Sequence, residues 1–350
     1  MRVVLADPPA FTPPYDHELA SALARAGADV ELVTSRFRFG ERPAPDGYRL
    51  VESLYPRSAW ARRNLVRLPL KLAEHPFAAR SVLARPADVV HFQWLSVPEL
   101  DRLLLRTDRP LVLTAHDLLP RRTASRTRLW RSLFARFDRV VVHSSRGREV
   151  LSAFGVPETK LRMIPHPVFR SDPPRADDGR TVLALGVIRS YKGLPDAVEA
   201  VLQVPDARLL VAGDPRIPLD EPRRRAGARA EWRLGYLDRS ALDRALSDAT
   251  VAIFPYAPEL DQSGALLQAL GAGVPAVVYD VGGLGEVVRA FDAGRVVPPG
   301  DVDGLATALR ELLTDPTALA SARAGAARAR DELTWDAAAA AHLALYEELV

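Results

Sequence analysis

Residues 249–280 read ATVAIFPYAPELDQSGALLQALGAGVPAVVYD, and they place a helix-like stretch between two short apolar runs. The runs at 249–256 and 275–280 are apolar along most of their length, as is typical of strands buried on both faces. The stretch between them consists largely of small and leucine residues and stops at Gly273, a common helix end. This order predicts a strand, a helix and a second strand of a parallel sheet.

The same alternation extends in both directions over the 350 residues. It is interrupted at residues 160–179, a proline-rich segment without periodicity that we interpret as an interdomain linker. We therefore predict two doubly wound, Rossmann-like α/β domains, residues 1–168 and 169–332. Ligands of such sheets bind at the carboxyl ends of strands, so we expect a site in a cleft where the two domains face each other. The predicted strands lie at 2–6, 28–34, 87–93, 110–116, 138–144, 180–186, 207–213, 249–255, 275–280 and 294–299.

Composition and charge exclude several classes of protein. The chain has no cysteine, which excludes a disulfide framework and a thiolate metal site. No apolar run approaches the length of a membrane-spanning helix, and the first residues are typical of a buried strand, not of a signal peptide. The net charge of +3 is small, and no nucleic-acid-binding motif is present. We expect a cytoplasmic protein that needs no metal or other cofactor and binds no nucleic acid.

Two loops of the second half carry groups suited to an anion. Arg189 and Lys192 follow the predicted strand that ends at Gly186, and they precede a helix start at Gly193. Backbone N–H groups at a helix N-terminus bind anions, and the two cations beside it would hold a diphosphate. The alternative is that both side chains are simply solvated in a surface loop.

The second loop is the Gln-Ser-Gly turn before the Ala- and Leu-rich helix. Ser263 can cap that helix, and Gly264 lets a ligand approach the backbone. Capping by Ser263 needs no ligand, so this turn indicates a site only in combination with the first loop.

Six stretches carry a resemblance to a known family: DVVHFQW, LVLTAHDLLP, GVIRSYKG, LLVAGD, GYLDRSALDRALSDATVAIFPY and QSGALLQALGAGVPAVVYDVGGLGEVV. Together they resemble the GT-B glycosyltransferases, close to family four of the retaining enzymes that use nucleotide sugars. The resemblance covers essentially the whole chain and implies the GT-B architecture. It also implies that residues 333–350 form a last helix that crosses back onto the first domain.

The resemblance implies a nucleoside diphosphate sugar as donor, held mostly by the second domain without a metal ion. Arg189 and Lys192 match the family's diphosphate-binding pair. His116, at the end of a predicted strand, matches a histidine beside the donor sugar that could polarise a hydroxyl or accept a proton. A hydrogen-bonded structural histidine is the alternative. The donor-binding residues that the resemblance implies are Gly186, Gly213, Tyr236, Ser263, Gly264 and Gln268.

This chain departs from the family at three places. The family often has an arginine directly after the glycine, where this chain has Val187. Many members carry two glutamates eight residues apart, and here these positions are Leu260, with Asp261 beside it, and Gln268. The loop after the first strand, residues 7–18, has prolines in place of the usual Gly-Gly turn. The second departure leaves the sugar and the base open but not the diphosphate-binding pair, and Gln268 could still bind a ribose hydroxyl.

The acceptor side offers weaker signals. Thr12 and Tyr15 in the proline-rich loop, and Asp117 after His116, would line the first domain's part of the cleft. His91, near the end of another predicted strand, would line the acceptor pocket. The alternative for the loop is that its prolines only shape a turn.

Two segments, 57–80 and 121–137, are basic and amphipathic, which suggests contact with an anionic membrane surface at the inner face of a membrane. The alternative is a solvated face above a stripe of core residues. The basic residues of the first segment are Arg57, Arg62, Arg63, Arg67, Lys71 and Arg80, and its apolar stripe is Ala61, Leu65, Leu68 and Leu72. The apolar residues of the second are Leu129, Trp130, Leu133 and Phe134.

Three functions remain open. The first is a retaining glycosyltransferase that acts on a lipid-linked or cell-envelope glycan. The second is the same chemistry on a soluble small molecule. The third is a catalytically weak partner subunit that binds a nucleotide sugar or glycan, an alternative that the replaced glutamates favour and that Arg189, Lys192 and His116 oppose. A sugar-nucleotide epimerase shares the fold but explains the two loops less well.

Overall fold

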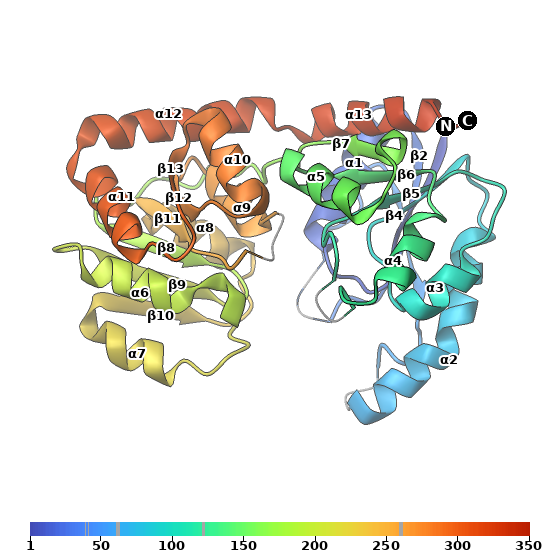
Figure 1. Cartoon of the computed structure of the whole chain (residues 1–350), viewed down its shortest axis with the longest axis horizontal. Coiled ribbons are helices and arrows are strands. Elements are labelled where there is room, and N and C mark those ends of the chain that lie inside the picture. Colours follow the sequence, from blue (N-terminus) through green and yellow to red (C-terminus); the bar gives the residue numbers. More distant parts are fainter. Residues whose placement is uncertain (39, 41, 61–63, 121–122, 259–261) are drawn as a thin grey trace. The chain divides into compact units, whose positions relative to one another are not determined.

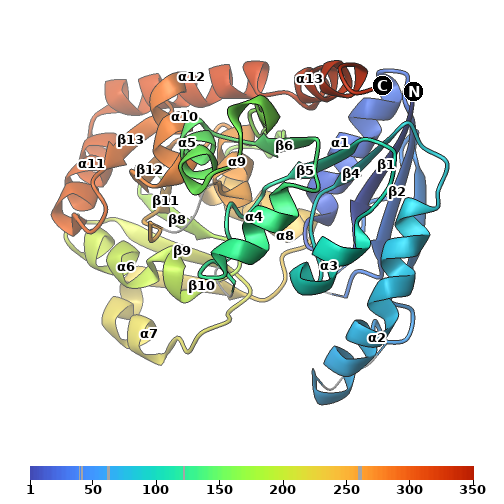
Figure 2. The same ribbon diagram turned by 45° about the vertical axis from the view of Figure 1, so that its right-hand side comes forward.

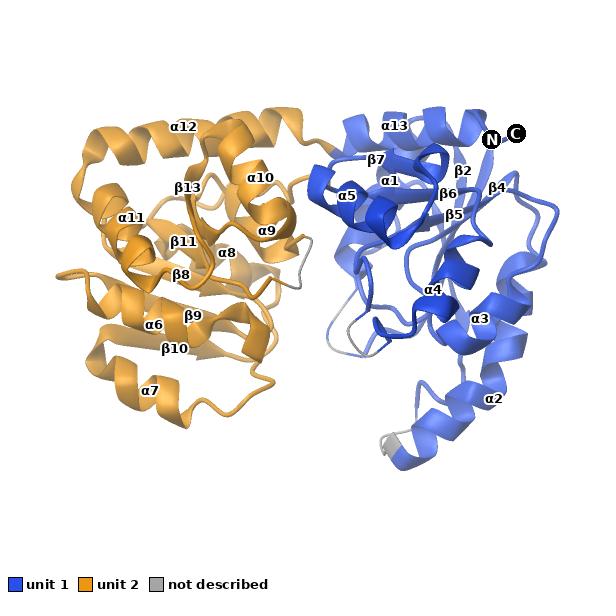
Figure 3. Cartoon of the chain, viewed as in Figure 1, with its two compact units in different colours: residues 1–165, 335–350 blue, residues 166–334 orange. Residues whose placement is uncertain are grey.

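The structure is a computed structural model of residues 1–350, and it describes all of them except 39, 41, 61–63, 121–122 and 259–261. The chain divides into two compact units, which Figures 1 and 3 show. Unit 1 comprises residues 1–165 and 335–350, and unit 2 comprises residues 166–334.

Unit 1 is built on a seven-stranded sheet in the order β3-β2-β1-β4-β5-β6-β7, with every pairing parallel. The predicted strands of the first half are all present, and the structure adds β3 and β7 at the two edges. β7 lies within the segment that we interpreted as a linker. The bounds are β1 Arg2–Asp7, β2 Asp29–Ser35, β3 Arg49–Leu54, β4 Val89–Phe92, β5 Leu111–Thr114, β6 Arg139–Val142 and β7 Leu161–Met163.

Helices cover this sheet. On one side α1 packs against β2 and against the C-terminal helix α13, whose Tyr346 is fully buried. On the opposite face of the sheet, apolar residues of α2, α4 and α5 pack with the strands in one core around Phe92 and Phe137. The bounds are α1 Pro13–Arg25, α2 Asn64–Leu83, α3 Pro98–Leu104, α4 Thr127–Phe134, α5 Ser145–Phe154, a 3₁₀ turn at Glu158–Lys160 and α13 Trp335–Glu347.

Unit 2 repeats the plan with a six-stranded sheet in the order β10-β9-β8-β11-β12-β13, again parallel throughout. Apolar residues cover both faces, with α6 and α11 on one and α8, α9 and α10 on the other. Two such doubly wound sheets confirm the predicted fold class. The strands are β8 Thr181–Leu185, β9 Arg208–Gly213, β10 Ala230–Leu234, β11 Val251–Phe254, β12 Ala276–Tyr279 and β13 Gly294–Val297.

The helices of unit 2 follow its strands in turn, as the view in Figure 2 also shows. Their bounds are α6 Leu194–Leu202, α7 Asp220–Ala226, α8 Arg239–Asp248, α9 Gly264–Gly271, α10 Gly282–Phe291, α11 Val302–Thr314 and α12 Pro316–Glu332, with 3₁₀ turns at Ser190–Lys192 and Gly227–Arg229.

The strand order identifies where each sheet can bind a ligand. In unit 1 the direction of winding reverses between β1 and β4, and in unit 2 it reverses between β8 and β11. Loops at the carboxyl ends of these strands diverge to opposite faces and leave a crevice at the reversal. The loops after β8 and β11 are those that carry Arg189, Lys192 and the Gln-Ser-Gly turn.

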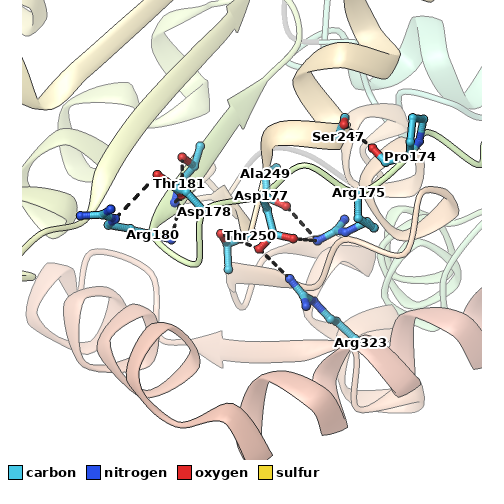
Figure 4. A network of polar contacts seen from close by, with 10 residues as sticks. All are labelled: Pro174, Arg175, Asp177, Asp178, Arg180, Thr181, Ser247, Ala249, Thr250 and Arg323. Atoms are coloured by element: carbon cyan, nitrogen blue, oxygen red, sulfur yellow. Dashed lines mark hydrogen bonds and ion pairs between the residues drawn. The ribbon is translucent and has the colours of Figure 1, made fainter.

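A polar network fixes the opposite, amino-terminal edge of the unit 2 sheet (Figure 4). Asp177 accepts hydrogen bonds from Arg175 at 3.1 Å, from Arg323 at 2.9 Å and from the Thr250 hydroxyl at 3.2 Å. Thr250 directly precedes β11, and Arg323 lies on α12. The network therefore ties the segment before β8 to the sheet and to α12, far from the carboxyl ends that bear the two loops.

Candidate functional site

The loop after β8 folds back tightly over its own strand. Gly186 has φ +103°, a conformation that favours glycine, and a Cβ there would lie 3.2 Å from Lys192 Nζ and 3.3 Å from Ala265 Cβ. Gly193 precedes α6 with φ +64°, and a Cβ there would lie only 1.8 Å from the carbonyl oxygen of Pro255. These close approaches show that the loop after β8 packs directly on the loop after β11.

The Gln-Ser-Gly turn forms the predicted cap. Ser263 is the N-cap of α9, and its Oγ accepts from the Leu266 N–H at 3.3 Å. The first turn of a helix leaves backbone N–H groups without intrahelical partners, and here they belong to Gly264 and Ala265. Leu260 and Asp261, which stand at and beside the family's first glutamate, lie outside the described residues.

Tyr256 joins the two loops. Its phenolic oxygen accepts from Lys192 Nζ at 2.7 Å and from Ser263 Oγ at 3.2 Å. Lys192 Nζ also lies 4.7 Å from the centre of the Tyr256 ring, within the range of a cation–π interaction. The two predicted diphosphate-binding elements are thus connected through one side chain that the sequence analysis did not single out.

The electrostatics of this site favour an anion. Burial lowers the pKa of Lys192 to about 8; the neighbouring Tyr191 works against this shift, and the Arg189 guanidinium adds to it. Arg189 itself is exposed, and its side chain has no hydrogen-bond or ion-pair partner among the described residues. Two cations close enough to repel each other, beside a helix N-terminus, gain stability when a diphosphate binds between them.

The other predicted donor residues divide into two groups. Gly213 is required by packing, because a Cβ there would lie 2.0 Å from the carbonyl oxygen of Gly186. Tyr236 follows β10 and is half exposed, and Gln268 is partly exposed in the second turn of α9. Gly264 differs from Gly213, since among the described residues a Cβ at Gly264 would meet only Phe169 Cε2, at 3.9 Å. The fold alone therefore does not require glycine at 264.

In unit 1 three predicted residues gather around Trp94, which follows β4. The ring of Trp94 stacks on His116 with centroids 5.2 Å apart and planes 16° apart, and its Nε1 donates to Thr12 Oγ1 at 2.9 Å. Tyr15 packs edge-on against His116 at 4.6 Å. His116 is partly exposed, and its Nε2 lies 3.1 Å from Gln93 Oε1. The loops after β1, β4 and β5 thus meet at the carboxyl edge of the unit 1 sheet.

The two other predicted acceptor residues, Asp117 and His91, lie in different environments. Asp117 is exposed beside this cluster. His91 is fully buried inside β4, where its Nδ1 lies 2.6 Å from the Tyr346 hydroxyl and its Nε2 lies 2.8 Å from Thr114 Oγ1. Both ring nitrogens of His91 are therefore used within unit 1, so we assign it a structural role and leave it out of the proposed acceptor site.

Comparison with known families settles what this arrangement belongs to. The profile of Glycosyltransferase Family 4 matches residues 15–170, and the profile of Glycosyl transferases group 1 matches residues 179–315. The chain belongs to the GT-B glycosyltransferases of the family 4 type. It accordingly transfers a sugar from a nucleotide sugar.

Relatives of this glycosyltransferase include enzymes of polymer and of lipid glycosylation. Glycogen synthase of Mycobacterium tuberculosis (strain CDC 1551 / Oshkosh) is 29% identical over 94% of this chain and 89% of its own length. The phosphatidyl-myo-inositol mannosyltransferase of Mycolicibacterium smegmatis is 27% identical over 99% of this chain and 94% of its own.

Solved structures show the same fold at lower identity. Sucrose-phosphate synthase from Thermosynechococcus elongatus has a TM-score of 0.80 and 22% identity, with 100% of this chain and 99% of that chain covered. Anabaena HepE in complex with UDP and glucose has a TM-score of 0.72 and 17% identity, with 100% of both chains covered.

The two basic segments of this glycosyltransferase differ in how far their apolar residues are exposed to solvent. On α4, Trp130, Leu133 and Phe134 are buried in the core of unit 1. For this segment the alternative, a solvated face above a stripe of core residues, is therefore correct. On α2 the predicted stripe faces solvent, with Leu65 90% and Leu68 62% exposed. Ala61, Arg62, Arg63, Arg121 and Arg122 lie outside the described residues.

A buried carboxylate pair in this glycosyltransferase also escaped the sequence analysis. Asp7, at the carboxyl end of β1, and Asp16, in the first turn of α1, are both buried, and Arg42 acts on both electrostatically. Burial, and then the Asp7 carboxylate, raise the pKa of Asp16 well above its usual range, so Asp16 is the member that retains a proton.

The part of the chain that the structure describes contains neither a metal-binding cluster nor a membrane-spanning helix. Among those residues no group of three or more His, Cys, Asp and Glu side chains is placed to hold a metal ion. Within the same described residues, no helix is both long and apolar enough to cross a membrane.

Proposed function

We propose that this protein is a retaining glycosyltransferase that moves a sugar from a nucleoside diphosphate sugar to a hydroxyl of a lipid-linked or cell-envelope glycan. The observation that carries the donor half of this proposal is the junction of Lys192, Tyr256 and Ser263. It brings the two candidate anion-binding loops, residues 186–193 and 263–266, together at the point where the winding of the unit 2 sheet reverses.

The reaction breaks the bond between the anomeric carbon and a diphosphate oxygen, and it forms a bond from that carbon to the acceptor oxygen. Negative charge develops on the leaving diphosphate. In the proposal Lys192, Arg189 and the N-terminus of α9 stabilise this charge, since preorganised donors act most strongly where charge develops. His116 then polarises a sugar hydroxyl or accepts the acceptor's proton.

The donor is best sought among nucleoside diphosphate sugars, and UDP sugars are the first to test because HepE is described in complex with UDP and glucose. A thermal-shift panel of nucleoside diphosphates and their sugars should show stabilisation by one base and one sugar class, because ligands that bind the folded state raise Tm. NMR of the product formed with that donor should show that the anomeric configuration is retained. No stabilisation by any nucleoside diphosphate, or an inverted product, would contradict the proposal.

We expect activity to persist in excess EDTA. In the proposed site Lys192 and Arg189 supply the positive charge that a metal ion would otherwise provide to the leaving diphosphate. The measurement compares initial rates with and without the chelator at saturating donor. Loss of activity that magnesium or manganese restores would show that the two cations do not suffice.

The acceptor half rests on α2. In both views of unit 1 the first described turns of α2 extend away from the sheet. Phe77 on this helix is 76% exposed, and Arg80 is exposed beside it; Arg67 is partly exposed. Apolar and basic side chains together on an exposed helix suit a surface of anionic lipids, where a lipid-linked acceptor would be found.

Vesicle binding tests this half of the proposal. We expect the protein to bind vesicles that contain phosphatidylglycerol several-fold better than neutral phosphatidylcholine vesicles, with salt weakening the binding. Leu65→Gln should reduce binding, whereas Met163→Gln, which changes another exposed apolar residue on the edge strand β7, should not. Equal binding to both kinds of vesicle, or none, would favour a soluble small-molecule acceptor.

A further inference from the structure

We propose that Tyr256 is a positioning residue that holds the Lys192 ammonium in place for the donor diphosphate and links it to Ser263 at the start of α9. The inference rests on the proposed function, because it concerns the same site. It adds that the two candidate anion-binding loops form one preassembled unit and that a single phenolic hydroxyl connects them.

The position of Tyr256 fixes its contacts. It lies two residues beyond β11, where its side chain is buried and its ring packs edge-on against Phe254 at 5.7 Å. Burial raises the pKa of Tyr256, so the phenol stays neutral and offers its oxygen as an acceptor. That oxygen is 2.7 Å from Lys192 Nζ, a short hydrogen bond of the kind in which the donor is charged.

Packing alone does not require this hydroxyl. A phenylalanine would fill nearly the same volume, and it would remove the hydrogen-bond acceptor that the Lys192 ammonium has among the described residues. Burying a polar group without a partner is unfavourable, so the Tyr256 hydroxyl offsets part of the desolvation of Lys192. It thereby keeps more of Lys192 in the charged form that a diphosphate needs.

The second hydrogen bond extends the effect to the helix. Ser263 Oγ donates to the Tyr256 oxygen and accepts from the Leu266 N–H, so the chain Lys192–Tyr256–Ser263–Leu266 runs from one loop into the first turn of α9. The cation and the helix N-terminus are then held at a fixed separation before the donor binds. A site arranged in advance loses less free energy to reorganisation as charge develops.

The chain allows a direct measurement, because it has three lysines, Lys71, Lys160 and Lys192. Incorporation of ¹³C-labelled lysine gives three side-chain NMR signals, and Lys71→Arg and Lys160→Arg variants assign the Lys192 signal by elimination. A pH titration of that signal reports the Lys192 pKa in the free enzyme without any activity assay. The groups that act on it are Arg189, Tyr191 and Tyr256.

In Tyr256→Phe we expect the pKa of Lys192 to fall by about one unit below its wild-type value, because the ammonium loses its acceptor while it stays desolvated. The Kd for UDP or for inorganic pyrophosphate, measured by calorimetry at about pH 8, should rise severalfold because less of Lys192 is charged at that pH. Ser263→Ala should weaken anion binding and leave the Lys192 pKa closer to wild type.

Tyr279→Phe is the matched control, since it removes another largely buried phenolic hydroxyl of unit 2, one that donates to Asp196 at 2.9 Å. It should lower Tm without moving the Lys192 pKa. If Tyr256→Phe only lowered Tm and left both the pKa and the Kd unchanged, Tyr256 would be a structural residue and this inference would fail. If the wild-type protein bound neither pyrophosphate nor any nucleoside diphosphate, the proposed function would fail instead.

Discussion

Replacing Lys192 by Ala is expected to lower kcat/KM for the donor by about a hundredfold, the usual effect of removing one group that stabilises developing charge. The loss should appear in kcat as well as in KM, because the ammonium interacts more strongly with the leaving diphosphate than with the bound donor. Arg189→Ala should lower kcat/KM by more than about tenfold but by less than Lys192→Ala does, since the Arg189 guanidinium is exposed and acts from the rim of the site.

Lys160→Ala provides the control for the Lys192 experiment. Lys160 Nζ donates to the carbonyl oxygens of Ala135 and Phe137 in unit 1, so its loss affects stability and not the donor site. Steady-state kinetics on folded protein, checked by circular dichroism, separates the two effects. Wild-type turnover in Lys192→Ala would overturn the assignment of this residue.

The pH dependence gives the same experiment a second readout. With a pKa of about 8, Lys192 is charged below that pH and loses its charge as the pH rises through it. Because kcat/KM reports the free enzyme, it should fall on the alkaline side with an apparent pKa near 8. Bound diphosphate favours the ammonium, so the corresponding fall in kcat should come at higher pH, and Lys192→Arg should abolish it.

The strands that the sequence predicted are more deeply buried than the edge strands β3 and β10, which it did not predict. β1 and β11 are buried over nearly all of their residues and appear as continuous apolar runs. The edge strands β3 and β10 expose much of their length and mix charged with apolar residues, so no single periodicity identifies them. A strand with a neighbour on one side only is specified by the sheet that it joins and less by its own sequence.

The sequence predicted Lys192 and Ser263 as site residues, but it did not predict Tyr256, which lies between them. Lys192 and Ser263 follow from local rules about loops, caps and helix N-termini. Tyr256 connects them only because β8 and β11 are adjacent in the sheet, although Lys192 and Tyr256 are 64 residues apart in sequence. The pairing of Asp7 with Asp16 likewise depends on how the first loop closes over β1.

The segments 57–80 and 121–137 show a limit of another kind. Both combine arginines with an apolar stripe, and the pattern alone does not say whether the stripe finds a partner. α4 packs against α3 and buries its stripe, whereas α2 leaves Leu65 and Leu68 in solvent. The first described turns of α2 extend away from the sheet, and the pattern of apolar and basic residues does not predict this difference.

Gly264→Val is expected to raise the Kd for the cognate nucleoside diphosphate by more than about tenfold while the protein stays folded. Gly264 is exposed at the first position of α9, and of the residues that the structure describes an added Cβ would meet only Phe169, at 3.9 Å from its Cε2. A Cβ therefore fits the described structure, and the valine side chain would occupy the space beside the N–H groups that the proposed diphosphate needs. Gly264→Ala should weaken binding less, because it adds a single methyl group.

Gly271→Ala, at the other end of the same helix, separates a helix effect from a site effect. A Cβ at Gly271 would lie 2.1 Å from the carbonyl oxygen of Phe169, so this variant should lower Tm and leave the Kd of the folded fraction unchanged. Gly264→Ala, which replaces glycine by a better helix former, should keep or raise Tm. Isothermal titration calorimetry of the three variants with the nucleoside diphosphate gives the Kd, and differential scanning calorimetry of the same proteins gives the Tm. Since the fold leaves room for a side chain at residue 264, unchanged affinity in Gly264→Val would mean that the turn serves only to begin α9 and that the diphosphate binds elsewhere.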